Sequence, residues 1–308
     1  MHKIKTAPPL FSNQLVSQVD GSGYAASCDG VRIYYECRGD GPPLIILNNF
    51  FMTASQWELF TRRIRQAFTV VTYDLRHQGR SDRVTEPTSL ADHVKDLAAL
   101  VDHLGYQSIF LLGTCVSTLI CRDYALQWPD RVSKLILVGP MFNPFGCLHR
   151  TLLHRSLLAS LEAGGPEALF DHYYPLLHTA RTIENNRTAG YLALKIRFVE
   201  NNPREQLFKH LHSTLKIEDR SDLLEQLDPP TLLLCGEDDF LTSRDALETL
   251  CRVMPRARYE LIEMAGHDPY VEATAEFEAR VLAFLRATGD PANAGSEPST
   301  HVATTAAQ

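Results

Sequence analysis

The chain has 308 residues, of which 44% are hydrophobic and 22% charged, with a formal net charge of -7. This length and apolar content can bury a large core, and they suit one domain with an insertion. The mild acidity and the lack of a concentrated basic stretch exclude the usual composition of a nucleic-acid-binding protein. No run of about 18 apolar residues occurs, so the sequence predicts no transmembrane helix.

The two ends of the chain differ in composition from the middle. Residues 1–20 lack the apolar stretch of a signal peptide, and we expect a flexible leader there. Residues 288–308 are rich in small and polar residues that cannot offset the entropy of ordering, which predicts a disordered tail. The seven cysteines are irregularly spaced without a Cys-x-x-Cys pair, which favours reduced thiols and a cytoplasmic protein.

The first predicted element is a β-hairpin, because residues 23–27 and 31–37 flank an Asp29-Gly30 turn. Six apolar runs follow, as expected of strands buried on both faces of a parallel sheet. These predicted strands are residues 44–47, 70–73, 109–112, 134–138, 231–235 and 259–263. Segments of helical period, such as 90–104 and 118–127, lie between them. This alternation predicts a mostly parallel, doubly wound α/β sheet.

One long stretch, residues 141–228, interrupts this alternation. It contains helical patterns and no convincing strand, with predicted helices at residues 152–163, 167–178, 189–201 and 205–215. We therefore expect a helical cap inserted into a core of residues 21–140 and 229–287, over the carboxyl ends of the strands. Its apolar and aromatic side chains suit an acyl pocket, although packing of a helical cap produces the same stripes. They are Phe170, Tyr173, Tyr174, Leu177, Tyr191 and Phe198.

The strand at residues 109–112 leads into Gly113-Thr114-Cys115-Val116-Ser117 and then into a helix. This strand–turn–helix pattern resembles the nucleophile elbow Gly-x-nucleophile-x-Gly of the α/β-hydrolase superfamily. Small residues beside the nucleophile let the strand and the helix approach closely. Ser117 stands where a second glycine is usual, which makes this packing tighter. The alternative is that Cys115 is one more buried, inert thiol.

The acid and the base of a catalytic triad follow in the order of that superfamily. The strand at residues 231–235 ends in Gly236-Glu237-Asp238-Asp239, a pattern that resembles strand–Gly-x-x-Asp and assigns the acid to Asp239. Asp238 remains an alternative, and Glu237 a weaker one. His267 follows the last strand in a Gly-His motif. The resemblance implies that His267 accepts the thiol proton and that Asp239 orients its imidazole.

The resemblance also implies an oxyanion hole made by the backbone N–H groups of Phe50 and Val116. Many relatives have His-Gly in the turn before Phe50, where this chain has Asn48-Asn49. Asparagine tolerates the positive φ of that glycine better than most residues, and both amide side chains can donate hydrogen bonds. We therefore count Asn48 and Asn49 among the candidate substrate-binding residues.

Three further hydrophobic residues, Phe51, Met141 and Phe142, are expected to line the same site because they follow strand ends near the elbow. A metal site is not expected, since His210 and His212 lie two apart on different faces of a helix. No Rossmann or P-loop glycine pattern occurs, so no nucleotide cofactor is implied.

A cysteine nucleophile bears on the reaction type. A thiolate is a soft nucleophile, formed readily beside an imidazolium or a helix N-terminus. Exchange between two thioesters is near thermoneutral. We therefore predict acyl transfer from a coenzyme A or acyl-carrier-protein thioester through an acyl-Cys115 intermediate. The acceptor is a small molecule, or the acyl group leaves by cyclising or hydrolytic release. Polyhydroxyalkanoate synthases and some thioesterase domains resemble this chain in having a cysteine elbow.

Residues 47–57 and 68–75 also resemble the 3-hydroxyacyl transferase family that makes the lipid half of rhamnolipids. That resemblance implies fatty-acyl or polyketide substrates in secondary metabolism. Two alternatives remain. One is a Cys-dependent hydrolase of esters or lactones. The other, less favoured, is a hydrolase-fold binding protein without catalysis.

Overall fold

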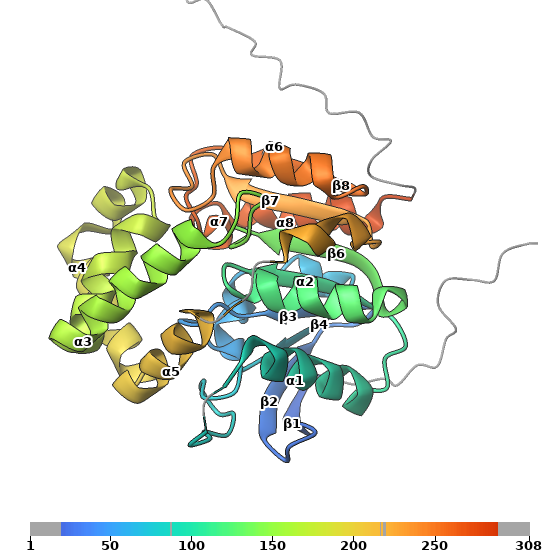
Figure 1. Ribbon diagram of the computed structural model, residues 1–308, viewed down its shortest axis with the longest axis horizontal. Helices are drawn as coiled ribbons and strands as arrows, with labels where there is room; N and C mark the ends of the chain where they lie inside the picture. Colours follow the sequence, from blue (N-terminus) through green and yellow to red (C-terminus); the bar gives the residue numbers. More distant parts are fainter. Residues whose placement is uncertain (1–19, 87, 216, 218–219, 289–308) are drawn as a thin grey trace, which may run out of the picture.

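The computed structural model describes residues 20–86, 88–215, 217 and 220–288, and these form one eight-stranded sheet with helices around it (Figure 1). The strand order is β1-β2-β4-β3-β5-β6-β7-β8. The strands are β1 (Gly21–Ala26), β2 (Arg32–Arg38), β3 (Pro43–Leu47), β4 (Thr69–Tyr73), β5 (Ile109–Thr114), β6 (Val132–Val138), β7 (Thr231–Gly236) and β8 (Ala257–Ile262). The expected leader and tail fall almost entirely outside the described residues.

The sheet is antiparallel at one edge and parallel elsewhere. β1 pairs with β2, and β2 with β4, in antiparallel register, and the remaining neighbours are parallel. The predicted hairpin is thus the β1–β2 edge. Strands β3 to β7 are almost wholly buried because helices cover both faces, which explains their continuous apolar sequence.

The helices pack on the two faces of the sheet in separate hydrophobic layers. One layer contains α1 (Leu90–His103), α2 (Ser117–Gln127) and α6 (Arg244–Val253), and the other contains α7 (Pro269–Glu272) and α8 (Thr274–Arg286). Short 3-10 helices lie at Ala54–Leu59, Ile64–Gln66, Pro129–Arg131 and Ser221–Gln226. The predicted fold class, a doubly wound α/β sheet of the α/β-hydrolase type, is confirmed.

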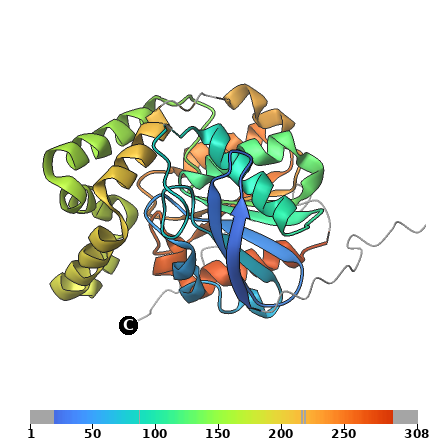
Figure 2. The same ribbon diagram turned by 90° about the horizontal axis from the view of Figure 1, so that it is seen from below.

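Between β6 and β7 the described residues form three α-helices, α3 (Leu148–Leu177), α4 (Ala180–Asn201) and α5 (Arg204–Leu215), which make up the helical insertion. It packs around a hydrophobic cluster of its own and projects to one side of the sheet (Figures 1 and 2). A kink at Gly165 separates the two halves of α3, where the sequence predicts two helices. The first half of α4, before a kink at Arg187, was not predicted because its polar sequence lacks an apolar period.

No helix in the described part of the chain combines the length and apolar character needed to span a bilayer.

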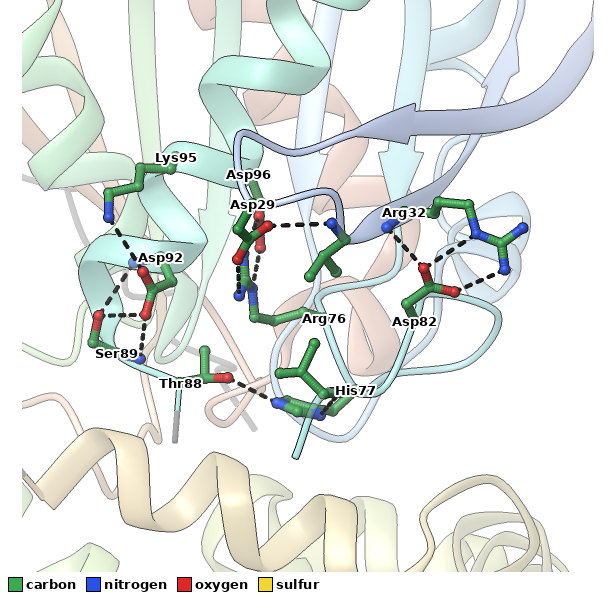
Figure 3. Close-up of polar contacts among 12 residues, drawn as sticks. Asp29, Arg32, Arg76, His77, Asp82, Thr88, Ser89, Asp92, Lys95 and Asp96 are labelled. Carbon is green, nitrogen blue, oxygen red and sulfur yellow. Dashed lines mark hydrogen bonds and ion pairs between the residues drawn. The ribbon is translucent and has the colours of Figure 1, made fainter. Parts of the chain in front are cut away.

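A buried ion pair ties the loop after β4 to α1 (Figure 3). Arg76 Nε and Nη2 donate to the two carboxylate oxygens of Asp96 at 2.7 and 2.6 Å, and Arg76 Nη1 donates to Asp29 at 3.0 Å. Burial opposes the charge on Arg76, but the two carboxylates outweigh it and raise the pKa of the guanidinium. The two ion pairs of Arg76, with Asp96 and with Asp29, therefore join the loop after β4 to α1 and to the β1–β2 turn.

We expect Arg76→Ala to lower the free energy of unfolding by about 3–5 kcal/mol, because it leaves the Asp96 carboxylate buried without its partner. Equilibrium unfolding in urea measures this loss. The matched control is Arg32→Ala, which breaks the exposed ion pair with Asp82 (Figure 3) and should leave stability nearly unchanged. Equal losses in the two variants would contradict the structural role of Arg76.

Four buried histidines make the fold sensitive to acid. Burial, the largest cause, lowers the pKa of His77 to about 4, of His93 and His154 to about 3, and that of His210 well below its ordinary value. As the pH falls below about 6.5, these histidines bind protons in the unfolded chain but stay unprotonated in the folded chain. This contribution to stability is present above about pH 6.5 and is lost progressively as the pH falls to about 3.

We expect His93→Leu to reduce the fall in unfolding free energy over this range by up to about 1.4 kcal/mol per pH unit. Within the described part of the chain, neither ring nitrogen of His93 has a hydrogen-bond partner, so an apolar side chain removes the proton linkage without breaking a hydrogen bond. Urea unfolding at several pH values measures the slope. His149→Leu, at an exposed position of α3, should leave the slope unchanged. An unchanged slope in His93→Leu would refute this account.

Candidate active site

Cys115 lies in a sharp turn between β5 and α2. Its φ is 51°, in the left-handed region that a cysteine rarely adopts. The close approach expected at Gly113 is present, since a Cβ there would lie 2.5 Å from Cys121 Sγ and 2.9 Å from the Ser117 carbonyl oxygen. This geometry lifts the half-buried Cys115 to the carboxyl end of the sheet, at the start of α2.

Ser117, at the position usual for a second glycine, is fully buried. Its hydroxyl donates a short hydrogen bond to the backbone carbonyl of Asn48, in the turn after β3. The extra side chain therefore joins the elbow to the turn that carries Phe50. A glycine could not make this link.

His267 and Asp239 meet after β8 and β7. His267 Nδ1 lies 2.9 and 3.1 Å from the two carboxylate oxygens of Asp239, and both side chains are completely buried. Asp239 Oδ1 also accepts hydrogen bonds from the backbone N–H groups of Leu241 and Thr242, which fix the carboxylate. Asp238 and Glu237, the alternatives for the acid, are exposed and make no contact with His267 in the described structure.

A glycine after β6 makes room for the imidazole. Gly139 has a φ of 56°, and a Cβ there would lie 2.6 Å from His267 Cε1. The backbone N–H of His267 donates to the carbonyl of Leu177 at 2.9 Å. The end of α3 therefore fixes the loop that carries His267, so the helical insertion and the histidine are coupled.

The environment of His267 favours its charged form. Burial opposes the charge, but Asp239 and then Cys115 outweigh it and raise the pKa of the imidazole well above its ordinary value. His267 Nε2 is buried without a hydrogen bond of ordinary geometry, although the Cys115 side chain is near enough to affect the ring. The arrangement places a thiol beside an imidazole whose other nitrogen is held by a carboxylate.

Two backbone N–H groups near Cys115 are free to stabilise an oxyanion. Among the described residues, those of Phe50 and Val116 have no acceptor, whereas the N–H of Phe51 donates to Asn49 Oδ1 at 2.8 Å. The expected positive φ at Asn49 is not observed. The Asn49 side chain shapes the turn instead, by capping the N–H of Phe51.

The side chains of Asn48 and Asn49 make hydrogen bonds inside the protein, and neither residue lines the pocket beside Cys115. Asn48 donates to the Tyr73 carbonyl at 2.7 Å and accepts from Trp57 Nε1 at 2.7 Å. Asn49 Nδ2 donates to the Tyr270 hydroxyl, which in turn donates to Asp268. These hydrogen bonds connect the turn after β3 to the loop of His267.

Tyr270 and Asp268 were not singled out in the sequence. Their one signal is that they follow His267 within three residues. The packing that brings Tyr270 against the turn after β3 is not visible in a single sequence, because 221 residues separate it from Asn49.

A narrow pocket adjoins Cys115. Its free volume is about 30 Å³, and its walls come from strand-end turns and the helical insertion. The lining residues are Phe50, Phe51, Cys115, Val116, Met141, Leu153, His154, Leu157, Tyr173, Leu176, Leu177, Leu211 and Leu241. Phe142 is not among them, because its ring packs against the buried Arg122 guanidinium. Within the described ranges, no cluster of three or more His, Cys, Asp or Glu side chains could hold a metal ion.

Curated relatives match most of the chain. A putative carbamate hydrolase RutD of Azorhizobium caulinodans is 27% identical over 235 residues, which cover 76% of this chain and 88% of the relative. The RutD protein of Caulobacter sp. strain K31, with the same description, is 28% identical over 259 residues, covering 82% and 95% of the two chains.

Solved structures share the fold at low identity. A thermophilic esterase from Thermogutta terrifontis superposes with a TM-score of 0.77 and 22% identity, covering 86% of this chain and 98% of the esterase. The enol-lactonase from Burkholderia xenovorans LB400 superposes with a TM-score of 0.74 and 20% identity, over 85% and 99% of the two chains. The family model described as "Alpha/beta hydrolase family" matches residues 44–280. With most of its length matched, this chain belongs to the alpha/beta hydrolase family.

Proposed function

We propose that this protein hydrolyses small carboxylic esters or lactones through an acyl-Cys115 intermediate. The observation that carries the proposal is the left-handed turn of Cys115, which lies beside His267 and lines one pocket with Phe50 and Val116, whose N–H groups have no acceptor among the described residues. This backbone conformation costs free energy, and residues held in such conformations cluster at functional sites.

In the first step, His267 Nε2 accepts the thiol proton of Cys115, and Sγ attacks the carbonyl carbon of the substrate. The carbonyl π electrons move to the oxygen, where the N–H groups of Phe50 and Val116 stabilise the negative charge. The carbon–oxygen bond to the alcohol then breaks, and the imidazolium of His267 protonates the departing oxygen. The products are an alcohol and a thioester on Cys115.

In the second step, water attacks the thioester. His267 Nε2 accepts a proton from this water, and Asp239 holds the ring in the orientation that the transfer needs. Collapse of the tetrahedral intermediate releases a carboxylic acid and restores the Cys115 thiolate beside the imidazolium. Each cycle consumes one water.

The size of the pocket favours small acyl groups. Its free volume of about 30 Å³ holds roughly two water molecules. A longer acyl chain exceeds this volume, so it enters only if lining side chains move. The names of relatives, putative carbamate hydrolase and enol-lactonase, also describe hydrolysis and support water as the final acceptor.

Acyl transfer is the second candidate, favoured by the thiol itself. Exchange from a coenzyme A or acyl-carrier-protein thioester onto Cys115 costs little free energy. The acyl group would then pass to a small-molecule acceptor or leave by cyclisation, as in secondary metabolism. The resemblance to the 3-hydroxyacyl transferase family motivates this candidate, and it shares the residues Cys115, His267 and Asp239 with the hydrolase.

We place this activity in the cytoplasm. All seven cysteines are free thiols, including the exposed Cys28 and the half-buried Cys147. Free thiols persist in a reducing compartment, where disulfides are rare.

We expect the wild-type protein to gain the mass of one acyl group when it is quenched during turnover of a small ester, and Cys115→Ala to gain none. Intact mass spectrometry measures the adduct, and treatment with hydroxylamine at neutral pH should release it as a thioester. Cys121→Ala is the matched control, because this thiol is buried under the elbow and should not be acylated. An adduct that persists in Cys115→Ala would exclude Cys115 as the nucleophile.

The same experiment separates the two candidates. A hydrolase turns over esters at a rate that added amines or alcohols do not change, whereas a transferase forms a new ester or amide. Cys115→Ser should retain some activity with a larger share of hydrolysis. A protein that forms no adduct and cleaves neither esters nor thioesters is a binding protein, which refutes both candidates.

We expect Asp239→Asn to lower kcat/KM by roughly 100-fold or more, because His267 loses the carboxylate that orients and charges it. Asp239 raises the pKa of His267, so the variant should lose the protonated imidazole at a lower pH than wild type does. The alkaline limb of the pH–rate profile should therefore move to lower pH. Asp238→Asn, at the exposed neighbour, should change neither quantity. Equal effects in both variants would argue against Asp239 as the acid.

A further inference from the structure

Glu272, the last residue of α7, binds two separate segments beside the candidate base. Its Oε2 accepts a hydrogen bond at 2.5 Å from the backbone N–H of Gly266, the residue before His267. Its Oε1 accepts from the backbone N–H and the hydroxyl of Thr179 at 2.8 and 2.9 Å. Thr179 lies between α3 and α4 in the helical insertion. One carboxylate therefore joins the loop of the base to the junction between two insertion helices.

The three contacts of Glu272 suit a carboxylate and not its amide. Among the residues that the structure describes, this side chain hydrogen-bonds to Gly266 and Thr179 and forms no ion pair. An ionised carboxylate has acceptors on both oxygens, so it can receive all three donors at once. A carboxamide has one oxygen, and its NH2 group would face one of the N–H groups.

The segment before His267 packs closely against the same junction. A Cβ on Gly266 would lie 2.7 Å from the Leu177 carbonyl oxygen and 2.9 Å from Glu272 Oε2, so a side chain has no room there. The N–H of His267 donates to that Leu177 carbonyl. Two consecutive N–H groups of this loop are therefore held, one by Glu272 and one by the end of α3.

The backbone of His267 determines where its imidazole lies. Asp239 holds Nδ1 at 2.9 Å, and the Cys115 side chain is close enough to the ring to favour its charge. A displacement of about 1 Å at a reacting group can cost roughly 100-fold in rate. Glu272 is not among the residues that line the pocket beside Cys115. Its effect on a reaction there would therefore pass through the backbone that it holds.

We propose that Glu272 is a positioning residue for His267, and that it makes the alignment of this base depend on the position of the helical insertion. With Glu272 in place, the junction between α3 and α4 and the backbone of Gly266 and His267 form one hydrogen-bonded unit. This inference rests on the proposed function in one respect, namely that Cys115 and His267 react as a pair.

We expect Glu272→Gln to lower kcat roughly tenfold and Glu272→Ala up to about 100-fold, with KM changed by less than about twofold. The amide keeps one acceptor, whereas alanine loses all three contacts. KM should stay because neither change alters the lining of the pocket. Steady-state hydrolysis of a small ester measures both constants. The matched control is Glu276→Gln, at an exposed position of α8 where the glutamate pairs with Arg280, and it should change neither constant.

A second measurement needs no turnover. Iodoacetamide alkylates thiolates, and an imidazolium beside Cys115 stabilises its thiolate. In Glu272→Gln and Glu272→Ala, alkylation of Cys115 should therefore begin at a higher pH than in wild type, in the same direction as in His267→Ala. Peptide mass spectrometry follows each cysteine separately. The exposed Cys28 is the internal reference, and its pH profile should be the same in all variants.

A merely structural Glu272 would lower the free energy of unfolding in urea without moving the alkylation profile of Cys115, and that result would overturn the inference. A rise in KM with kcat unchanged would overturn it too. If Glu272→Ala does not fold, the nearly isosteric Glu272→Gln still decides the question. A profile that shifts in Glu272→Gln, in a protein whose wild type cleaves no ester, would refute the proposed function alone. An unchanged profile in His267→Ala would overturn both.

Discussion

The left-handed backbone of Cys115 is the constraint on which the arrangement of the site depends. A residue at φ 51° can present its side chain above the sheet only if the strand before it and the helix after it nearly touch. Gly113 allows that contact, because any side chain there would meet Cys121 and the backbone of Ser117. β5 and α2 are buried in the core on either side of the turn, and this packing sustains the strained conformation.

Hydrogen bonds between separate strand ends hold the other parts of the site around this turn. Ser117 links the elbow to Asn48, and Asn49 links the same turn to Tyr270 in the loop of His267. These partners are buried, so each lost hydrogen bond would leave an unpaired polar group. Pre-organised N–H groups are effective at developing negative charge because they need no reorganisation during the reaction. The network therefore gives the Phe50 and Val116 amides a fixed direction before substrate arrives.

The sequence sufficed to predict the sheet and the order of the candidate triad, because both depend on local patterns. Strands β3 to β7 are continuous apolar runs, and Cys115, Asp239 and His267 each follow a strand within a recognisable turn. Contacts between distant segments were not predictable in this way. The conformation of Asn49 depends on Tyr270, and the burial of His154 against Thr214 depends on how α3 packs on α5. No periodicity or spacing contains that information.

The two parts of the molecule contribute differently to the chemistry. In the proposed reaction, the sheet supplies the candidate nucleophile, base and oxyanion groups from strand ends that are buried. The insertion supplies most of the pocket wall, and the contact of Leu177 with the backbone of His267 connects it to the base. A displacement of α3 large enough to admit a long acyl chain would therefore also disturb His267. Under the proposed function, this coupling favours small acyl groups, because the position of α3 that closes the pocket is also the one that holds the backbone of His267.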